Sequence, residues 1–212
     1  MQQLFLTSSV HTVAADIANK VSLTTLQNKK CAFIVTPVEP DGLDQKWLHN
    51  DRQSLQDAGF ETFDYTITDK NEQQLRDELA DSAFIYVSGG NTYFMLQEAQ
   101  KSGFIAVIKD FIQSGDKTYI STSSGSIVAG PDTQPALRIE KIEDAPDLDG
   151  FEGFNLVNFC VLPHWGSNTF RKLYLETRLE HAYKKPQVPL LLLTDTQYVW
   201  VQGDMHQIID VR

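Results

Sequence analysis

The sequence predicts an α/β fold in which a mainly parallel central sheet is flanked by helices. Short apolar runs that favour strands alternate with stretches of helical periodicity up to a serine-rich turn near the middle of the chain, and this alternation is typical of consecutive βα units. Hydrophobic residues make up 42% of the 212 residues, enough to bury the core of a globular domain. We therefore expect one domain over residues 1–212, without repeats or a linker.

The strands and helices of the first part of the chain are expected to alternate, with two consecutive helices before the last strand. The expected strands are apolar or β-branched runs at Leu4–Thr7, Cys31–Thr36, Thr62–Ile67, Ala83–Val87 and Thr118–Ile120. The expected helices lie at Val10–Val21, around Gln45–Ala58, and at Asn71–Leu79, Thr92–Lys101 and Ile105–Ser114. Leu75 and Leu79 have the i,i+4 spacing of a buried helix face. Gly103 and Gly115 are expected to end the last two helices.

The second part of the chain has a different character. Pro131–Asn155 is rich in Asp, Glu, Pro and Gly, and such a long loop in a compact domain is often functional. Two further strands, one helix and a C-terminal antiparallel hairpin are expected after it. These are the strands Leu156–Leu162 and Val188–Thr194, the helix Thr169–Tyr183, and the hairpin strands Tyr198–Val201 and Gln207–Val211 around Gly203-Asp204.

Charge and composition argue against several classes of partner. The net charge of −10 disfavours nucleic acid and anionic membranes, and no run approaches the ~20 apolar residues that cross a bilayer. The N-terminus lacks the basic start and apolar stretch of a signal peptide. Cys31 and Cys160 lie in apolar runs, as expected for reduced thiols, and are too few for a metal site. We expect a cytoplasmic protein without cofactor or metal, and the sequence carries no indication of its oligomeric state.

The stretch Lys117–Gly130 carries the strongest indication of function. It reads Ser-Thr-Ser-Ser-Gly at 121–125, between a β-prone run and an apolar run that can open a helix. A strand that turns abruptly into a helix through small residues can hold one side chain on a tight, strained turn, as in the nucleophile elbow Gly-x-Ser-x-Gly. Ser123 is therefore the candidate nucleophile. Ser121 replaces the first glycine, and a plain serine-rich loop is the alternative interpretation.

A serine nucleophile needs a base, an orienting acid and donors for the oxyanion. His164 alone among the five histidines directly follows an expected central strand. Two acids are open: Asp195 follows the apolar run 189–193, and Asp144 lies in the long loop. The backbone N–H of Ser124 and the Gly89-Gly90 turn are candidate oxyanion donors, because absent side chains let backbone approach a substrate.

Three blocks resemble the dipeptidase E (aspartyl dipeptidase) family of serine peptidases. Ser88–Thr92, Tyr119–Gly125 and Leu162–His164 are similar to that family's Gly-Gly-Asn-Thr, Tyr-Ile-Gly-x-Ser-Ala-Gly and Pro-His motifs, in the same order and at similar spacing. The resemblance implies a class I glutamine amidotransferase-like (flavodoxin-like) fold with serine in place of the elbow cysteine. It also implies hydrolysis of short peptides, possible substrates being dipeptides with an N-terminal Asp.

The resemblance also assigns catalytic roles to individual positions. It implies that Ser123 is the nucleophile and His164 the base, with Gly90 and Ser124 as oxyanion donors. For the acid it favours Asp195, which follows the strand after the histidine, over Asp144, which resembles a second acidic motif.

It further implies that Arg171, and with it Asn91, binds the substrate. Two other classes stay open: a catalytically inactive relative that binds a small metabolite or partner at the same site, and a flavodoxin-like cofactor binder, which the missing phosphate loop disfavours.

Overall fold

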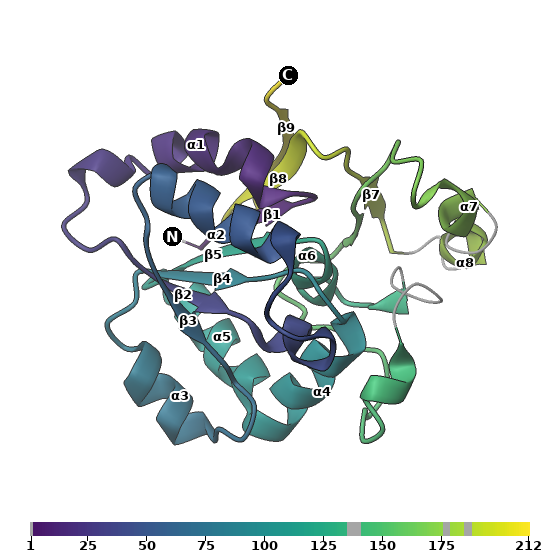
Figure 1. Ribbon diagram of the computed structural model, residues 1–212, viewed down its shortest axis with the longest axis horizontal. Helices are drawn as coiled ribbons and strands as arrows, with labels where there is room; N and C mark the ends of the chain where they lie inside the picture. The colour runs from purple at the N-terminus through teal and green to yellow at the C-terminus, as the bar shows by residue number, and fades with distance from the viewer. Residues whose placement is uncertain (1, 135–140, 176–178, 185–187) are drawn as a thin grey trace.

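A seven-stranded sheet in the order β3-β2-β4-β5-β1-β8-β9 forms the centre of the molecule (Figure 1). The structure, a computed structural model, describes residues 2–134, 141–175, 179–184 and 188–212. The strands of this sheet are β1 (Gln3–Thr7), β2 (Lys30–Ile34), β3 (Glu61–Tyr65), β4 (Phe84–Val87), β5 (Thr118–Thr122), β8 (Gln197–Gln202) and β9 (Met205–Asp210). The first five are mutually parallel, and β8 and β9 add an antiparallel hairpin beside β1. The predicted fold class is therefore confirmed.

Helices cover both faces of this sheet (Figure 1). One face carries α1 (Val10–Lys20) and α2 (Lys46–Asp57), and the other carries α3 (Glu72–Leu79), α4 (Thr92–Ser102) and α5 (Phe104–Gln113). In β2, Cys31 and Phe33 join the core under α1 and α2, whereas Ala32 and Ile34 join the opposite core. Successive side chains of a strand point to opposite faces of the sheet, and helices cover both faces here. Consecutive residues of β2 are therefore apolar.

The elements before the serine-rich turn agree with the prediction within a few residues. The main difference is at Thr36, which leaves β2 early and opens the 3-10 segment η2 (Thr36–Asp41). Pro37 and Pro40 lie in this segment and remove two backbone N–H groups. A second short segment, η1 (Leu23–Thr25), follows α1.

The expected central strand before His164 is wrong in its placement. Only β6 (Cys160–Leu162) is a strand there, and it pairs in parallel with β7 (Leu190–Leu192) in a separate two-stranded sheet. The edge of β1 is taken by β8, so β6 does not pair with β1. Further upstream, the backbone N–H groups of Phe154 and Leu156 donate to the carbonyls of Val128 and Ala129, at the end of the helix that follows Ser123.

Within the expected helix over 169–183, the structure describes α7 (Arg171–Leu173) and α8 (Leu179–Lys184). Residues 176–178 between them, including Arg178, lie outside the described residues. The long loop is described except for 135–140, and it includes the 3-10 segment η4 (Ile142–Asp144).

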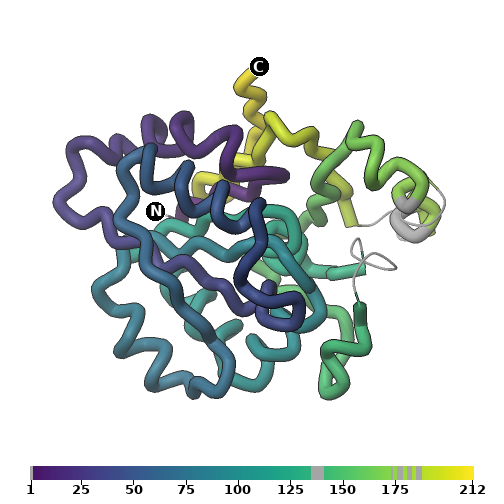
Figure 2. Tube along the Cα trace, viewed as in Figure 1, coloured from purple at the N-terminus to yellow at the C-terminus, as the bar shows by residue number. Residues whose placement is uncertain are grey.

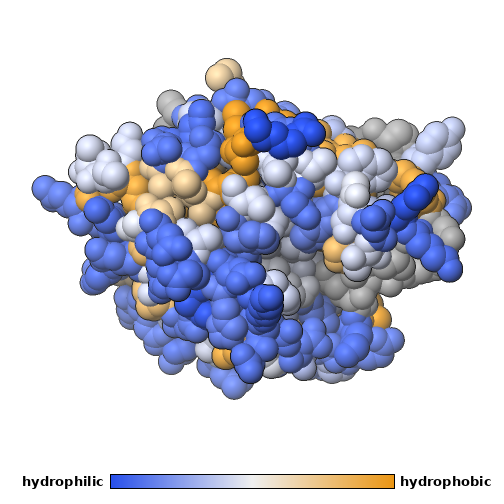
Figure 3. Space-filling model, turned by 45° about the horizontal axis from the view of Figure 1, so that its top comes forward, coloured by the Kyte–Doolittle hydropathy of each residue, from blue (hydrophilic) through white to orange (hydrophobic). Residues whose placement is uncertain are grey.

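The outer surface is mainly hydrophilic. Figure 3 shows blue side chains over most of one face, with apolar areas divided between them. Figure 2 shows the chain passing from the N-terminal strand through the sheet and returning in the C-terminal strands beside it. Cys31 and Cys160 are buried and are not joined in a disulfide. No helix in the described part of the chain is long and apolar enough to span a membrane.

Gly125, in the first turn of α6 (Ser124–Val128), the helix that follows Ser123, has no room for a side chain. A Cβ at Gly125 would lie 2.3 Å from the backbone oxygen of Val87 on β4, and backbone cannot yield cheaply. We expect Gly125→Ala to lower the free energy of unfolding by about 1–3 kcal/mol, as overpacking usually does, or roughly 2–12 °C in Tm for a chain of this size.

Gly89→Ala is the matched control, because its nearest contacts would be at 3.4 Å and longer. Thermal denaturation followed by circular dichroism measures both variants. Equal Tm values for the two would contradict the packing argument.

Candidate active site

Ser123 lies on a strained turn between β5 and α6. Its backbone has φ 50° and ψ −110°, a region that non-glycine residues occupy only where the surroundings impose it. The N–H of Ser123 donates to the carbonyl of Thr7 at the end of β1, and its own carbonyl accepts from Ser126 and Ile127 in α6. The tight strand-to-helix turn expected from the sequence is thus present at the carboxyl edge of the sheet.

The departure from glycine at Ser121 has a structural explanation. Ser121 is fully buried, and its hydroxyl lies 2.9 Å from the Ser126 hydroxyl on the other side of the turn. The Ser126 hydroxyl donates onward to the Thr7 carbonyl at 2.7 Å. A serine at 121 therefore joins the two arms of the turn and links them to β1.

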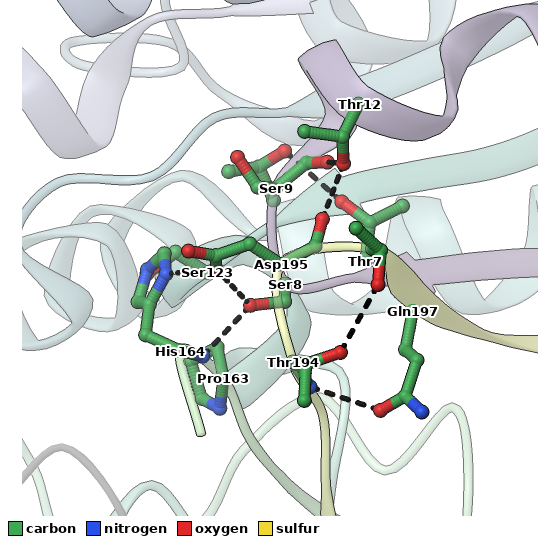
Figure 4. A network of polar contacts seen from close by, with 12 residues as sticks. Thr7, Ser8, Ser9, Thr12, Ser123, Pro163, His164, Thr194, Asp195 and Gln197 are labelled. Atoms are coloured by element: carbon green, nitrogen blue, oxygen red, sulfur yellow. Dashed lines mark hydrogen bonds and ion pairs between the residues drawn. The ribbon is translucent and has the colours of Figure 1, made fainter. Parts of the chain in front are cut away.

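His164 connects Ser123 to a carboxylate. Its Nε2 lies 3.0 Å from Oγ of Ser123 and its Nδ1 lies 2.7 Å from Oδ1 of Asp195 (Figure 4). The backbone of His164 has φ +59°, and its ring stacks on Phe170 with centroids 4.9 Å apart. Backbone and ring are thus both held, so the imidazole lies between the hydroxyl and the carboxylate.

Ser8 completes this arrangement, and the sequence analysis missed it. Its hydroxyl accepts from the backbone N–H of His164 and donates to Oδ1 of Asp195, both at 2.7 Å (Figure 4). The hydrogen bond from His164 lowers the pKa of Asp195 below its usual value, and the one from Ser8 adds a smaller effect. Burial acts in the other direction. A usable signal existed: Ser8 directly follows β1, whose carboxyl end meets the same sheet edge.

The geometry allows proton transfer along one line. Because Asp195 can only accept when ionised, Nδ1 carries a hydrogen and Nε2 of neutral His164 is free to take the hydroxyl proton of Ser123. Gly90 and Ser124 lie beside this line. Ser124 donates its hydroxyl to the Gly90 carbonyl at 2.5 Å, and Gly90 has φ +131° with no space for a Cβ against the Pro37 carbonyl.

Two predicted site residues, Asp144 and Asn91, contact each other and not Ser123. Asp144, the alternative acid, accepts from Nδ2 of Asn91 at 3.2 Å, whereas His164 contacts Asp195. The Asn91 side chain also donates to the Lys141 carbonyl and caps α4 by accepting from Tyr93 and Phe94. All its hydrogen-bonding groups are used to fix the long loop to α4, so a contact between this side chain and substrate has no support in the geometry.

A cavity of about 300 Å³ opens in front of Ser123. Its lining residues come from six segments of the chain. They are Ser9, His11, Trp47, Asp51, Gly89, Gly90, Thr122, Ser123, Ser124, Ile127, Pro163, His164, Phe170 and Tyr174. The sequence analysis missed His11, Trp47 and Asp51, since they belong to α1 and α2 and approach the site only through packing. Among the described residues, no three His, Cys, Asp or Glu side chains form a group that could hold a metal ion.

Arg171 does not line this cavity. It lines a second cavity of about 310 Å³ together with Trp165, Asn168 and Leu175. Tyr174 lines both cavities, so they are neighbours. Arg171 could therefore meet only a substrate that extends beyond the space in front of Ser123.

Comparisons with known proteins identify the family of the chain. The family model of peptidase family S51 matches residues 4–209. The chain belongs to peptidase family S51. It is therefore a peptidase, and the expected resemblance to the peptidase E group is confirmed.

Individual relatives give the same assignment. The chain is 32% identical over 173 residues to an uncharacterized peptidase of Pasteurella multocida, covering 80% of each chain. It is 29% identical to a peptidase E of Shewanella denitrificans, covering 74% of this chain and 65% of that one. In fold it matches a crystal structure from Listeria monocytogenes EGD-e named as a peptidase E, with a TM-score of 0.87, 24% identity and complete coverage of both chains.

Removal of the Ser8 hydroxyl should weaken the site while Ser123, His164 and Asp195 all remain in place. We expect Ser8→Ala to lower kcat for peptide hydrolysis by about 10- to 100-fold, the usual value of one hydrogen bond to a charged group. Steady-state kinetics measures the effect, with Ser114→Ala, an exposed serine that bonds Asp116, as the control. An unchanged kcat in Ser8→Ala would show that His164 and Asp195 do not depend on this hydroxyl.

Proposed function

We propose that the protein is a serine-type exopeptidase that hydrolyses short peptides through Ser123, His164 and Asp195. The observation that carries this proposal is the contact of 3.0 Å between Ser123 Oγ and His164 Nε2, on a strained elbow and with Asp195 on the far side of the ring. Nucleophile, base and orienting acid are thereby in the order that acyl transfer requires.

The reaction proceeds in two halves. As Oγ of Ser123 attacks the peptide carbonyl, its proton passes to Nε2 of His164, and the oxyanion forms beside the backbone N–H groups of Gly90 and Ser124. The C–N bond then breaks, and His164 returns the proton to the leaving amine. Water then attacks the acyl-enzyme while His164 takes its proton, and His164 gives this proton to Oγ of Ser123 as the acyl C–O bond breaks and the acid product leaves.

The cavity supports small substrates with a free amino terminus. A volume of about 300 Å³ is at the low end of small-molecule sites. Two of its neighbours, Asp51 and Asp195, are acids, and no Lys or Arg belongs to its described lining residues. A peptide ammonium group meets a favourable potential there, which suits a dipeptidase. The family resemblance adds dipeptides with an N-terminal Asp as the preferred class.

The second candidate is an inactive relative that binds a metabolite or partner at the same edge. It keeps the cavity but not an activated serine. The hydrogen-bonded line from Asp195 to Ser123 favours the enzyme, because pure binding does not require it.

Loss of either Ser123 or His164 should abolish hydrolysis. We expect Ser123→Ala and His164→Ala each to lower kcat/KM on a dipeptide library by at least about 10³-fold, as in other serine triads. A fluorophosphonate probe should label the wild type and not Ser123→Ala. His49→Ala, an exposed histidine of α2 that pairs with Asp44, is the control. Losses below about tenfold in both variants would place the chemistry elsewhere.

The two candidate acids should separate clearly. Asp195→Asn removes the acceptor that orients Nδ1 of His164, and we expect a loss of about 10²- to 10⁴-fold in kcat. Asp144→Asn removes only a contact with Asn91, and we expect no more than about a tenfold loss, the value of one hydrogen bond. The same kinetic assay measures both variants. A greater loss in Asp144→Asn would reverse the assignment.

A further inference from the structure

A second imidazole–carboxylate pair lines the cavity in front of Ser123, and the mechanism above does not use it. Nδ1 of His11 lies 3.2 Å from Oδ1 of Asp51 and 2.9 Å from the hydroxyl of Ser9. Asp51 is only 2% exposed, and its other oxygen accepts from the Tyr86 hydroxyl at 2.8 Å. A buried carboxylate with two fixed partners can therefore set the orientation of the His11 ring.

The hydrogen bond to Asp51 also fixes which nitrogen of His11 carries a proton. An ionised carboxylate only accepts, so Nδ1 must donate to it. Within the described residues, Nε2 of His11 has no hydrogen-bond partner. The His11 side chain is 43% exposed and lines the cavity, so this nitrogen is available to a ligand.

The charges around His11 favour its protonated form. The hydrogen bond to Asp51 is the largest cause that raises the pKa of His11, burial opposes it, and the charges of Asp51 and Asp195 add to the rise. Nδ1 of His11 contacts Asp51 and Ser9, Asp195 acts on the ring through its charge, and Tyr86 contacts the other oxygen of Asp51. A protonated His11 offers an Nε2–H, which donates strongly to a carboxylate.

We propose that His11, held by Asp51, is the specificity-determining residue that binds a substrate carboxylate in the cavity. The inference rests on the proposed function and names the group that would bind the charged part of the peptide. Arg171 offers a fixed charge but lies in the neighbouring cavity, whereas His11 shares the cavity with Ser123. The carboxylate has two possible sources: the side chain of an N-terminal Asp, or the C-terminus of a dipeptide.

Three substrates distinguish the two sources. Asp-Leu and Asn-Leu differ only in the charge of the side chain, and Asp-Leu and Asp-Leu amide differ only in the charge of the C-terminus. We expect His11→Gln to reduce one of these two kcat/KM ratios by about 10- to 100-fold, the value of a charge-assisted hydrogen bond. The ratio that falls identifies the carboxylate. His49→Gln, from the exposed part of α2, should leave both ratios at the wild-type value.

The pH dependence supplies a readout that a purely structural His11 would not move. The affected kcat/KM ratio should be high where His11 is protonated and should fall as pH rises through the pKa of His11. Above that pH, Nε2 has no hydrogen to donate to the carboxylate. Any effect of pH on the chemical steps is common to both substrates of a pair and cancels in the ratio. Asp51→Asn removes the main cause of the raised pKa, so the fall should move to lower pH.

Each outcome has a definite meaning. Ratios in His11→Gln equal to those of the wild type would overturn the proposal, as would a fall in Arg171→Gln without one in His11→Gln. Should the wild type hydrolyse none of the peptides, the proposed function fails by itself. Isothermal titration calorimetry of the same peptides on the wild type and His11→Gln then decides the matter: weaker binding of the charged member supports His11, and equal binding overturns it.

Discussion

The backbone of Ser123 is the constraint on which the active edge depends. A positive φ at a serine costs of order 1–3 kcal/mol, so neighbouring strands must impose it. Gly125 packs against the Val87 carbonyl on β4, and the Thr7 carbonyl on β1 accepts from both Ser123 and Ser126. Because β4, β5 and β1 are adjacent parallel strands, their common carboxyl edge holds the hydroxyl in place.

Local patterns predicted what depends on local geometry. The elbow at Ser123 could be found because small residues between a strand and a helix have few other uses. The placement of β6 could not be predicted, because a short apolar run does not indicate which strand it pairs with. The strand that pairs with the edge of β1 is β8, from the C-terminal part of the chain. The sequence predicted an acid beside His164 and favoured Asp195 over Asp144. The contact between His164 and Asp195 itself is seen only in the fold.

The sequence analysis missed His11 and Asp51 for one physical reason. They lie on different helices, and they meet because α1 and α2 pack side by side over the same sheet face. Neither belongs to a motif, and an Asp in a helix is normally solvent-exposed. Arg171 has the expected chemistry and sequence position, but it lines the neighbouring cavity and not the one in front of Ser123.

The two imidazole–carboxylate pairs at the cavity require opposite protonation states. His164 must begin the cycle neutral, because its Nε2 takes the proton of Ser123, whereas His11 binds an anion only when protonated. The surroundings separate the two roles. Asp195 is half-exposed, while Asp51 is buried and bonded to Tyr86. A raised pKa at His11 extends its charged form to higher pH, which favours carboxylate binding beside the base.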